Sequence, residues 1–167
     1  SRNVFWKLNR FEWSNMFSYG EDNVVDFTKL NGIIGLFAPN ATGKSALLDS
    51  LSFALFDTSS RAYKAERILN NKKGSFRCKV GFEINETEYY IERKGKRLKN
   101  GHVKVDVDFW MIDDSNDRVS LNGDQRRTTN SNIRRAIGSY EDFVLTSLSL
   151  KNNSTVFIDK TQKERKD

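Results

Sequence analysis

The octapeptide Ala38-Pro39-Asn40-Ala41-Thr42-Gly43-Lys44-Ser45 decides the fold of this 167-residue chain. It matches the broader Walker A pattern, in which alanine replaces the first glycine and four residues precede Gly-Lys-Ser. In such a loop, backbone N–H groups and the first turn of the next helix converge on phosphate groups, and the helix dipole adds partial positive charge. The segment therefore predicts a phosphate-binding loop.

Three residues of the loop have separate roles. Gly43 lets the backbone pass close to phosphate oxygens, Lys44 brings a positive charge to the β and γ phosphates, and the Ser45 hydroxyl ligates Mg²⁺. ATP and Mg²⁺ are the expected cofactors, with Lys44 as the catalytic residue and Ser45 as the metal ligand. Ala38 and Ala41 depart from the glycine-rich form, and Ala41 is strained if its position needs a positive φ. The predicted nucleotide-binding residues of the loop are Ala38, Pro39, Asn40, Ala41, Thr42, Gly43, Lys44, Ser45 and Ala46.

The loop lies between a predicted strand and a predicted helix. Residues 32–37 are apolar throughout, as in a strand that is covered on both faces. From Gly43 to Phe56, apolar residues recur at helical spacing, which predicts an amphipathic helix. This order of strand, loop and helix is the context that the motif requires. It disfavours the alternative, an ordinary strand-to-helix turn.

Further strands and helices are predicted on both sides of this unit, which gives an α/β (α+β) fold. A hairpin is expected at Asn100-Gly101, a pair typical of tight turns. A helix capped by Asn130 or Ser131 is expected to end at Gly138. The predicted strands are 4–13, 23–27, 76–84, 88–97, 102–112 and 147–150, and shorter helical segments are expected at 65–69 and 140–145.

Composition narrows the function classes. Lys and Arg number 28 against 22 Asp and Glu, and this net charge of +6 favours a polyanionic partner. Cys78 and His102 are the single cysteine and histidine, which leaves no convincing disulfide, zinc cluster or Ser-His catalytic site. Since no apolar run approaches the roughly 18 residues of a membrane span, we expect one soluble domain, cytoplasmic or nuclear, with no membrane partner.

The phosphate loop resembles that of one group of ATPases. The segment 36–49 is similar to the loop of ABC-type chromosome-maintenance and repair ATPases, whose pattern has an asparagine where Asn40 stands. With its flanking strands, the basic loop at Arg61–Arg67 and the antiparallel strands, nearly the whole chain resembles the amino-terminal lobe of the SbcC/Rad-fifty family, including its phage and viral relatives. The resemblance implies a P-loop NTPase lobe with a mixed sheet, a phosphate-loop helix and an antiparallel β subdomain. It assigns residues 1–159 to this lobe and 160–167, with Lys163-Glu164-Arg165, to the start of a coiled-coil exit.

The resemblance also implies further nucleotide contacts. The base and ribose would lie against the loop around Phe17 and Ser18. The family's Q-loop glutamine, which helps to ligate Mg²⁺, falls on Lys151. Because a lysine cannot ligate a cation, Asn152 or Asn153 substitutes for it, the register slips, or the site hydrolyses ATP poorly.

The function that the resemblance implies needs more than this chain. Family members hydrolyse ATP as head-to-head dimers, and their Walker B acidic pair lies in a carboxy-terminal lobe. The chain would be the ATP- and Mg²⁺-binding half of a DNA-repair ATPase, inactive alone, that dimerises on ATP and processes DNA ends with an SbcD/Mre-type nuclease. Two alternatives stay open: a stand-alone P-loop kinase or GTPase, and a binding-only DNA module with a degenerate loop.

Two basic groups are candidate DNA contacts. The segment 93–99 carries five cations in seven residues on a predicted hairpin, which indicates either a salt-sensitive phosphate-backbone contact or a solvated hairpin tip. A second group, with the same two interpretations, comprises Arg126, Arg127, Arg134 and Arg135. The candidate DNA-binding residues are Arg61, Lys64, Lys94, Lys96, Arg97 and Lys99.

Other patterns are better explained by structure than by function. The segment 109–114 has the apolar-then-acidic order of a Walker B motif, but its alternating strand predicts a solvent-facing hairpin end at Asp113. The segment 120–125 lacks the paired glycines of an ABC signature and predicts a turn. Trp6, Trp13 and Trp110 are expected to pack in the core or at an edge.

Overall fold

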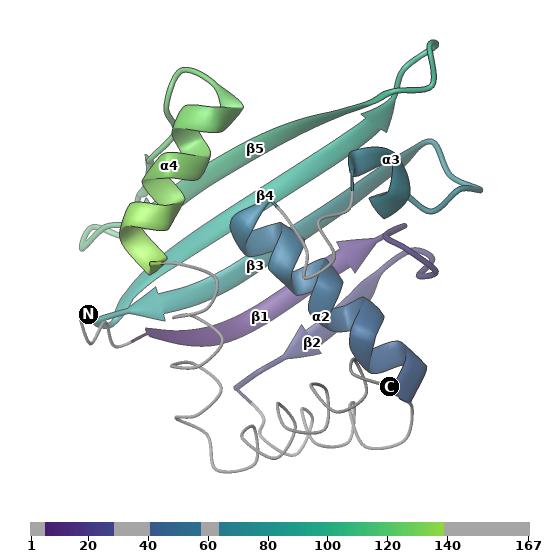
Figure 1. Ribbon diagram of the computed structural model, residues 1–167. Helices are drawn as coiled ribbons and strands as arrows, with labels where there is room; N and C mark the ends of the chain where they lie inside the picture. The colour runs from purple at the N-terminus through teal and green to yellow at the C-terminus, as the bar shows by residue number, and fades with distance from the viewer. Residues whose placement is uncertain (1–5, 29–40, 58–63, 139–167) are drawn as a thin grey trace.

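The protein folds as a twisted antiparallel sheet with helices packed on one face (Figure 1). The structure, a computed structural model, describes residues 6–28, 41–57 and 64–138. Its six strands have the order β2-β1-β3-β4-β5-β6. The strands are β1 (Trp6–Ser14), β2 (Asn23–Asp26), β3 (Ser75–Ile84), β4 (Thr87–Arg97), β5 (Val103–Ile112) and β6 (Arg118–Ser120). The helices are α2 (Ala41–Phe56), α3 (Ala65–Ile68) and α4 (Arg126–Ile137).

The side-chain alternation of the strands separates a core face from an open face. Val80 at the centre of β3 is fully buried, and its ladder partners Phe11 and Ile91 are fully buried as well. On the opposite face Trp110 stacks on Tyr90 at 5.4 Å between ring centroids, and the Arg118 guanidinium lies 3.7 Å above the Trp110 ring. Trp110 is thereby buried without belonging to the core, and the packing role predicted for it is confirmed.

Five of the predicted strands are confirmed within two residues at each described end, and so is the hairpin at Asn100-Gly101. There the Gly101 N–H donates to the Leu98 carbonyl at 3.0 Å, and Gly101 has a φ of +88°. Strand β6 was not predicted, because its three residues are all exposed and show no apolar alternation. Backbone pairing with the edge of β5, such as Met111 with Val119, is what makes it a strand.

The helix predicted after the phosphate loop is present, but the prediction that it is amphipathic is wrong. Every side chain of α2 from Asp49 to Phe56 is buried, including Ser50 and Ser52. A helix that is covered on all sides shows no polar face. Its small serines pack among apolar residues although they count as polar in a sequence pattern. The helix also starts at Ala41, earlier than the predicted Gly43.

The last described helix, α4, ends where predicted but starts earlier. Its C-cap is Gly138, whose φ of +84° suits glycine. Its N-cap is Gln125, whereas Asn130 or Ser131 was expected. The Thr129 hydroxyl, which is buried, accepts a hydrogen bond from the Gly123 N–H at 3.0 Å. The first turn itself is closed by the Thr129 N–H, which donates to the Gln125 carbonyl at 2.9 Å. The periodicity of the apolar residues does not report this turn.

The described residues include no helix that is long and apolar enough to cross a membrane. Some predictions lie outside the described residues and stay predictions: the strands at 32–37 and 147–150, the helical turn at 140–145 and the coiled-coil exit at 160–167.

Candidate nucleotide-binding site

Helix α2 carries the second half of the predicted phosphate loop. It begins at Ala41, so the backbone of Gly43, Lys44 and Ser45 belongs to its first turns. The first four N–H groups of an α-helix have no partner within the helix, and the dipole concentrates positive charge there. The start of α2 therefore has the local structure that the phosphate-loop motif requires, and the donors present fit a phosphate group. Ala38, Pro39 and Asn40 lie outside the described residues.

The middle of α2 is held against β3 and β4 by aromatic packing. The Phe53 ring meets the Phe76 ring edge to face at 5.6 Å between centroids. Phe76 in turn lies over Gly95, where an added Cβ would come 2.0 Å from the Phe76 ring. The missing side chain at Gly95 thus leaves room for the Phe76 ring between the strand and the helix.

The carboxyl end of α2 is held by a buried arginine. Arg93 Nε donates to the Ala54 carbonyl at 2.8 Å, and Nη2 donates to the Leu55 carbonyl at 3.4 Å. The last four carbonyls of a helix lack intrahelical partners, so Arg93 supplies donors for two of them. The Arg93 side chain is 0% exposed although it carries a charge.

Arg93 also connects α2 to α4 through Asp57 and Asn130. Arg93 Nη1 donates to Asn130 Oδ1 at 2.7 Å, and Asn130 Nδ2 donates to Asp57 Oδ2 at 2.6 Å. The Asp57 carboxylate lies 3.8 Å from Arg93 and also accepts from Arg126 Nε at 2.6 Å. Burial lowers the pKa of Arg93 to about 10, against the opposing effect of Asp57, so Arg93 remains charged at neutral pH.

This geometry corrects the prediction of a basic hairpin surface. Arg93 shares the core face of β4 with Ile91 and Gly95, because strand residues alternate between faces. Lys94, Lys96 and Lys99 are exposed, as a surface contact requires, whereas Arg97 is half-buried and shares the alternation of Arg93. All four arginines of the second basic group are exposed, and one of them, Arg126, is also paired with Asp57. Lys64 is exposed, and Arg61 lies outside the described residues.

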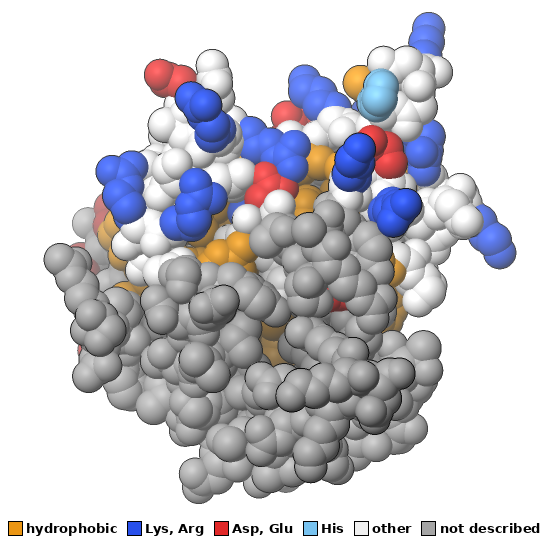
Figure 2. All heavy atoms as spheres, in the orientation of Figure 1, with side chains coloured by type: hydrophobic (Ala, Val, Ile, Leu, Met, Phe, Trp, Pro, Cys, Tyr) orange, Lys and Arg blue, Asp and Glu red, His pale blue; other side chains and the backbone are white. Residues whose placement is uncertain are grey.

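Lys and Arg side chains gather over two parts of the helix-bearing face (Figure 2). One group covers α4, and the other surrounds the end of the β4–β5 hairpin, which is marked by His102. His102 Nδ1 lies 3.8 Å from Glu66 Oε1, and its side chain is exposed. Both basic groups of the sequence are therefore surface features, apart from the buried Arg93.

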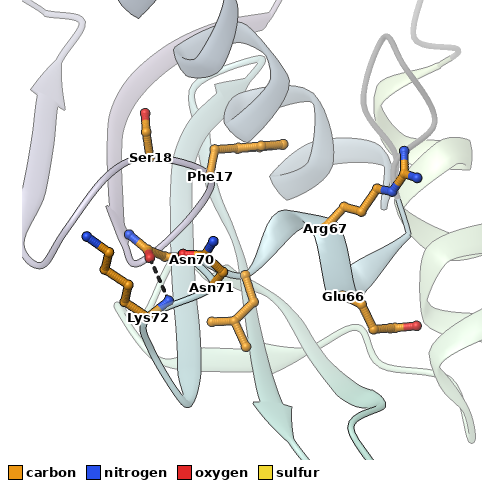
Figure 3. Close-up of a pocket in the computed structure, with 8 residues that line it drawn as sticks. Phe17, Ser18, Glu66, Arg67, Asn70, Asn71 and Lys72 are labelled. Atoms are coloured by element: carbon orange, nitrogen blue, oxygen red, sulfur yellow. Dashed lines mark hydrogen bonds between the residues drawn. The ribbon is translucent and has the colours of Figure 1, made fainter.

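A hollow of about 570 Å³ opens beside the loop predicted to contact the base and ribose (Figure 3). Phe17 and Ser18 lie on one side of it, and Asn70, Asn71 and Lys72 lie on the other. The Lys72 N–H donates to Asn70 Oδ1 at 3.0 Å. The remaining lining residues are Glu66, Arg67 and Leu69.

The two walls of the hollow are tied together by backbone hydrogen bonds. The Phe17 N–H donates to the Ile68 carbonyl at 2.6 Å, and the Asn70 N–H donates to the Asn15 carbonyl at 2.8 Å. Asn15 and Phe17 have φ values of +61° and +55°, a left-handed backbone that glycine adopts more readily. Non-glycine residues in this conformation cluster at functional sites. In Figure 1 the start of α2, helix α3 and the turn after β1 lie toward the same side of the molecule.

The facing wall at residues 70–72 was not predicted from the sequence. Its only local signal is a polar Asn-Asn-Lys-Lys turn after a short helix, which does not indicate a partner. The pairing of Met16 with Leu69 brings this turn to Phe17 and Ser18. This contact between distant segments is not visible in local patterns.

The acidic residue of the Walker B-like segment closes a turn, as predicted. Asp113 Oδ1 accepts from the Ser115 and Asp117 N–H groups, each at 2.9 Å, so it closes the turn between β5 and β6. The Walker B-like segment is thus a hairpin end. Cys78 is fully buried, and the described residues hold no group of His, Cys, Asp and Glu that could bind a metal ion.

Residues 10–167 match the protein-family model described as AAA domain. The chain belongs to this family. The chain is 43% identical over 170 residues to an uncharacterized protein of Acanthamoeba polyphaga mimivirus, covering 97% of this chain and 12% of that protein. It is 27% identical over 156 residues to the SbcC component of the SbcCD nuclease of Clostridium acetobutylicum, covering 89% of this chain and 13% of that protein.

A third relative is the DNA double-strand break repair Rad50 ATPase of Sulfolobus acidocaldarius. It is 37% identical over 75 residues, which cover 44% of this chain and 8% of that protein. The chain spans no more than 13% of the length of these three relatives. It is an SbcC/Rad50-like amino-terminal ATPase lobe, and the predicted resemblance, with its viral relatives, is confirmed.

Proposed function

We propose that this chain is the ATP- and Mg²⁺-binding half of an ATPase head that acts on DNA ends. The observation that carries the proposal is the placement of Gly43-Lys44-Ser45 at the start of a helix that is buried along its described length. A buried helix has a fixed axis, so its unpaired N–H groups form a preorganised phosphate site. Lys44 would bring charge to the terminal phosphates, and Ser45 would ligate Mg²⁺.

The hollow beside Phe17 and Ser18 is the proposed place for the base and ribose. It offers an aromatic ring at Phe17, a hydroxyl at Ser18 and an amide at Asn70, which together suit a flat, hydrogen-bonding ligand. Bound Mg²⁺ would neutralise charge on the phosphates, while this chain's residues bind and orient the nucleotide.

Turnover is proposed to require a second lobe and a second head. The family pattern places a Mg²⁺ ligand at Lys151, where only a neighbouring residue such as Asn152 has a suitable oxygen. A carboxy-terminal lobe would supply the acidic pair, and dimerisation on ATP would complete the site. The relatives named as SbcCD and Rad50 support a nuclease partner of the SbcD/Mre type and DNA as the substrate.

The outward cations of the β4–β5 hairpin are the proposed DNA contact. Lys94 and Lys96 are exposed, and Lys96 lies directly opposite Lys104 in the ladder. Like charges placed directly opposite each other destabilise a sheet, and bound phosphate would relieve their repulsion. Lys99 continues this surface at the hairpin turn, whereas the half-buried Arg97 lies on the other face of β4, in the same alternation as Arg93.

The test is a titration of Mg²⁺ with a fluorescent ATP analogue into the chain, alone and joined to a carboxy-terminal lobe. Lys44→Ala should abolish binding in both, whereas Lys7→Ala, the same change at an exposed strand position, should not alter it. Hydrolysis should require the added lobe. Hydrolysis by the chain alone would instead favour the kinase or GTPase alternative. Salt-dependent DNA binding that is indifferent to ATP would favour a binding-only module.

A further inference from the structure

A charged arginine lies within the described core, and its burial needs an explanation. Arg93 is 0% exposed, and its counter-ion Asp57 is 10% exposed. Taking an ion pair out of water is costly, and well-packed apolar residues of the same volume often give equal or greater stability. Stability alone therefore does not account for a charged pair at this place.

The backbone at Asp57 also favours a residue other than the one present. Asp57 follows the last turn of α2, its N–H donates to the Phe53 carbonyl at 2.8 Å, and its φ is +59°. Glycine is the usual residue in this left-handed position after a helix. The aspartate carboxylate, however, is the group that accepts from Asn130 and Arg126.

The network of Arg93, Asp57 and Asn130 contacts the carboxyl end of α2, which is remote from the phosphate loop. Arg93 donates to the Ala54 and Leu55 carbonyls, and Ser45 lies roughly 14 Å away along the helix axis at 1.5 Å per residue. The described side chains between these points, Leu47 and residues 49–54, are buried, and the helix runs unbroken from Ala41 to Phe56. A shift or tilt imposed at one end of such a rod is transmitted to the other.

We infer that Arg93 is a positioning residue for nucleotide binding, which together with Asp57 and Asn130 sets the placement of the phosphate-loop helix α2 relative to β4 and α4. This inference rests on the proposed nucleotide site at the start of α2. Arg93 can hold the end of α2 in place because its planar guanidinium donates to two helix carbonyls and to the Asn130 side-chain oxygen at once. A lysine would supply the charge but not the planar set of hydrogen-bond donors.

The test separates stability from nucleotide affinity. The double variant Arg93→Met with Asp57→Asn removes both charges and leaves side chains of similar size. We expect its melting temperature to stay within about 4 °C of that of the unmodified chain, which corresponds to a small change in the free energy of unfolding. We expect its affinity for the Mg²⁺-bound fluorescent ATP analogue to fall at least tenfold. Arg77→Met is the matched control, because Arg77 lies on the open face of the neighbouring strand and pairs with Glu92 at 2.7 Å.

Unchanged nucleotide affinity in a folded double variant would overturn the inference, and so would a double variant that fails to fold, since the pair would then act through stability. Asn130→Leu removes the hydrogen bonds of Asn130 to Arg93 and Asp57 and keeps both charges. It should weaken nucleotide binding at least threefold without unfolding the chain. Full affinity in that variant would count against coupling through α4.

A second measurement tests the positioning of α2 by Arg93, Asp57 and Asn130 without depending on the proposed function. Amide hydrogen exchange over Ala41–Phe56 needs no nucleotide, and it should be at least tenfold faster in the double variant than in Arg77→Met. If the unmodified chain binds no nucleotide, the proposed function fails. Unchanged exchange in α2 of the double variant would separately refute the positioning of α2 by Arg93, Asp57 and Asn130.

Discussion

Cys78 is a thiol enclosed in the core, and its burial determines how it titrates. Burial raises its pKa to about 12 from an ordinary value of 9.0, although Arg93 beside it acts in the opposite direction. The unfolded thiol therefore loses its proton at a lower pH than the folded one. The stabilising contribution is complete below about pH 9 and is lost as pH rises from 9 toward 12.

We accordingly expect the free energy of unfolding to fall with pH above about 9, more steeply in the unmodified chain than in Cys78→Ala. Denaturant titrations at a series of pH values check this. In parallel, a thiol reagent at pH 8 should modify Cys78 only as fast as the chain unfolds. Equal pH slopes in the two proteins would contradict the expectation.

Gly95 is a second residue whose role is set by one contact. An added Cβ would come 2.0 Å from the Phe76 ring, which cannot move away because Phe53 lies behind it. We expect Gly95→Ala to lower the free energy of unfolding by about 2 kcal/mol, as overpacking a core does. Gly81→Ala is the control, because its Cβ would meet only the edge of Tyr90, at 3.0 Å on the open face. Denaturant unfolding of the two variants should differ clearly, and equal losses would be evidence against this role of Gly95.

The sequence predicts which residues are chemically able to act, but not which of them face the core. Arg93 and Lys94 are adjacent cations in a basic run, and the charge pattern treats them alike. The period of two in a strand shows that they point to opposite faces. Which face is the inner one depends on α2 packing over β3 and β4, and that contact joins distant parts of the chain.

At the scale of the element, the sequence predicts helices best where a local signal closes them. Gly138 ended α4 in the prediction and ends it in the structure, because a φ of +84° is available to glycine at little cost. The start of α4 and the burial of α2 were missed, since each depends on tertiary contacts. In the sequence pattern Ser50 and Ser52 count as a polar face, but in the structure both are buried because the helix is covered on all sides.

Gly138→Ala should therefore destabilise the protein through α4. Its φ of +84° and ψ of −166° lie in a region that side chains other than glycine rarely adopt, and we expect a loss of about 1–3 kcal/mol in the free energy of unfolding. Gly74→Ala makes the same chemical change where the added Cβ meets nothing within 4 Å. It should be neutral within about 0.5 kcal/mol. Thermal unfolding of both variants checks the difference, and a neutral Gly138→Ala would show that the cap is dispensable.

At the scale of the whole molecule, the sheet has chemically different faces, and the sequence predicted part of this division. The phosphate-loop motif and the basic hairpin are local patterns, so both could be found in the sequence. The hollow at Phe17 and Ser18 needs residues 66–72 from another segment, and the Arg93 network needs three elements. Spacing along the chain does not report such contacts, because they depend on which segments pack together.

The open face of the sheet leads to a prediction in which stability and DNA binding change in opposite directions. Lys96 and Lys104 are exposed cross-strand partners, and neither forms an ion pair among the described residues. Removing both charges by Lys96→Gln with Lys104→Gln ends a like-charge contact, which should raise the free energy of unfolding by about 0.2–1 kcal/mol. The same change removes two cations that would displace counterions from duplex DNA.

DNA affinity should therefore fall in the double variant, and the slope of log K against log salt should become shallower by about 1–2. Fluorescence anisotropy of a labelled duplex, titrated at several salt concentrations, measures both. Lys7→Gln removes one charge at the opposite end of the same sheet, where Lys7 lies opposite Glu83 in the strand register, and should leave the slope unchanged. If the double variant is more stable but binds DNA with an unaltered slope, the repulsion between Lys96 and Lys104 is not relieved by phosphate, and the DNA contact must be sought elsewhere, first on the arginines of α4.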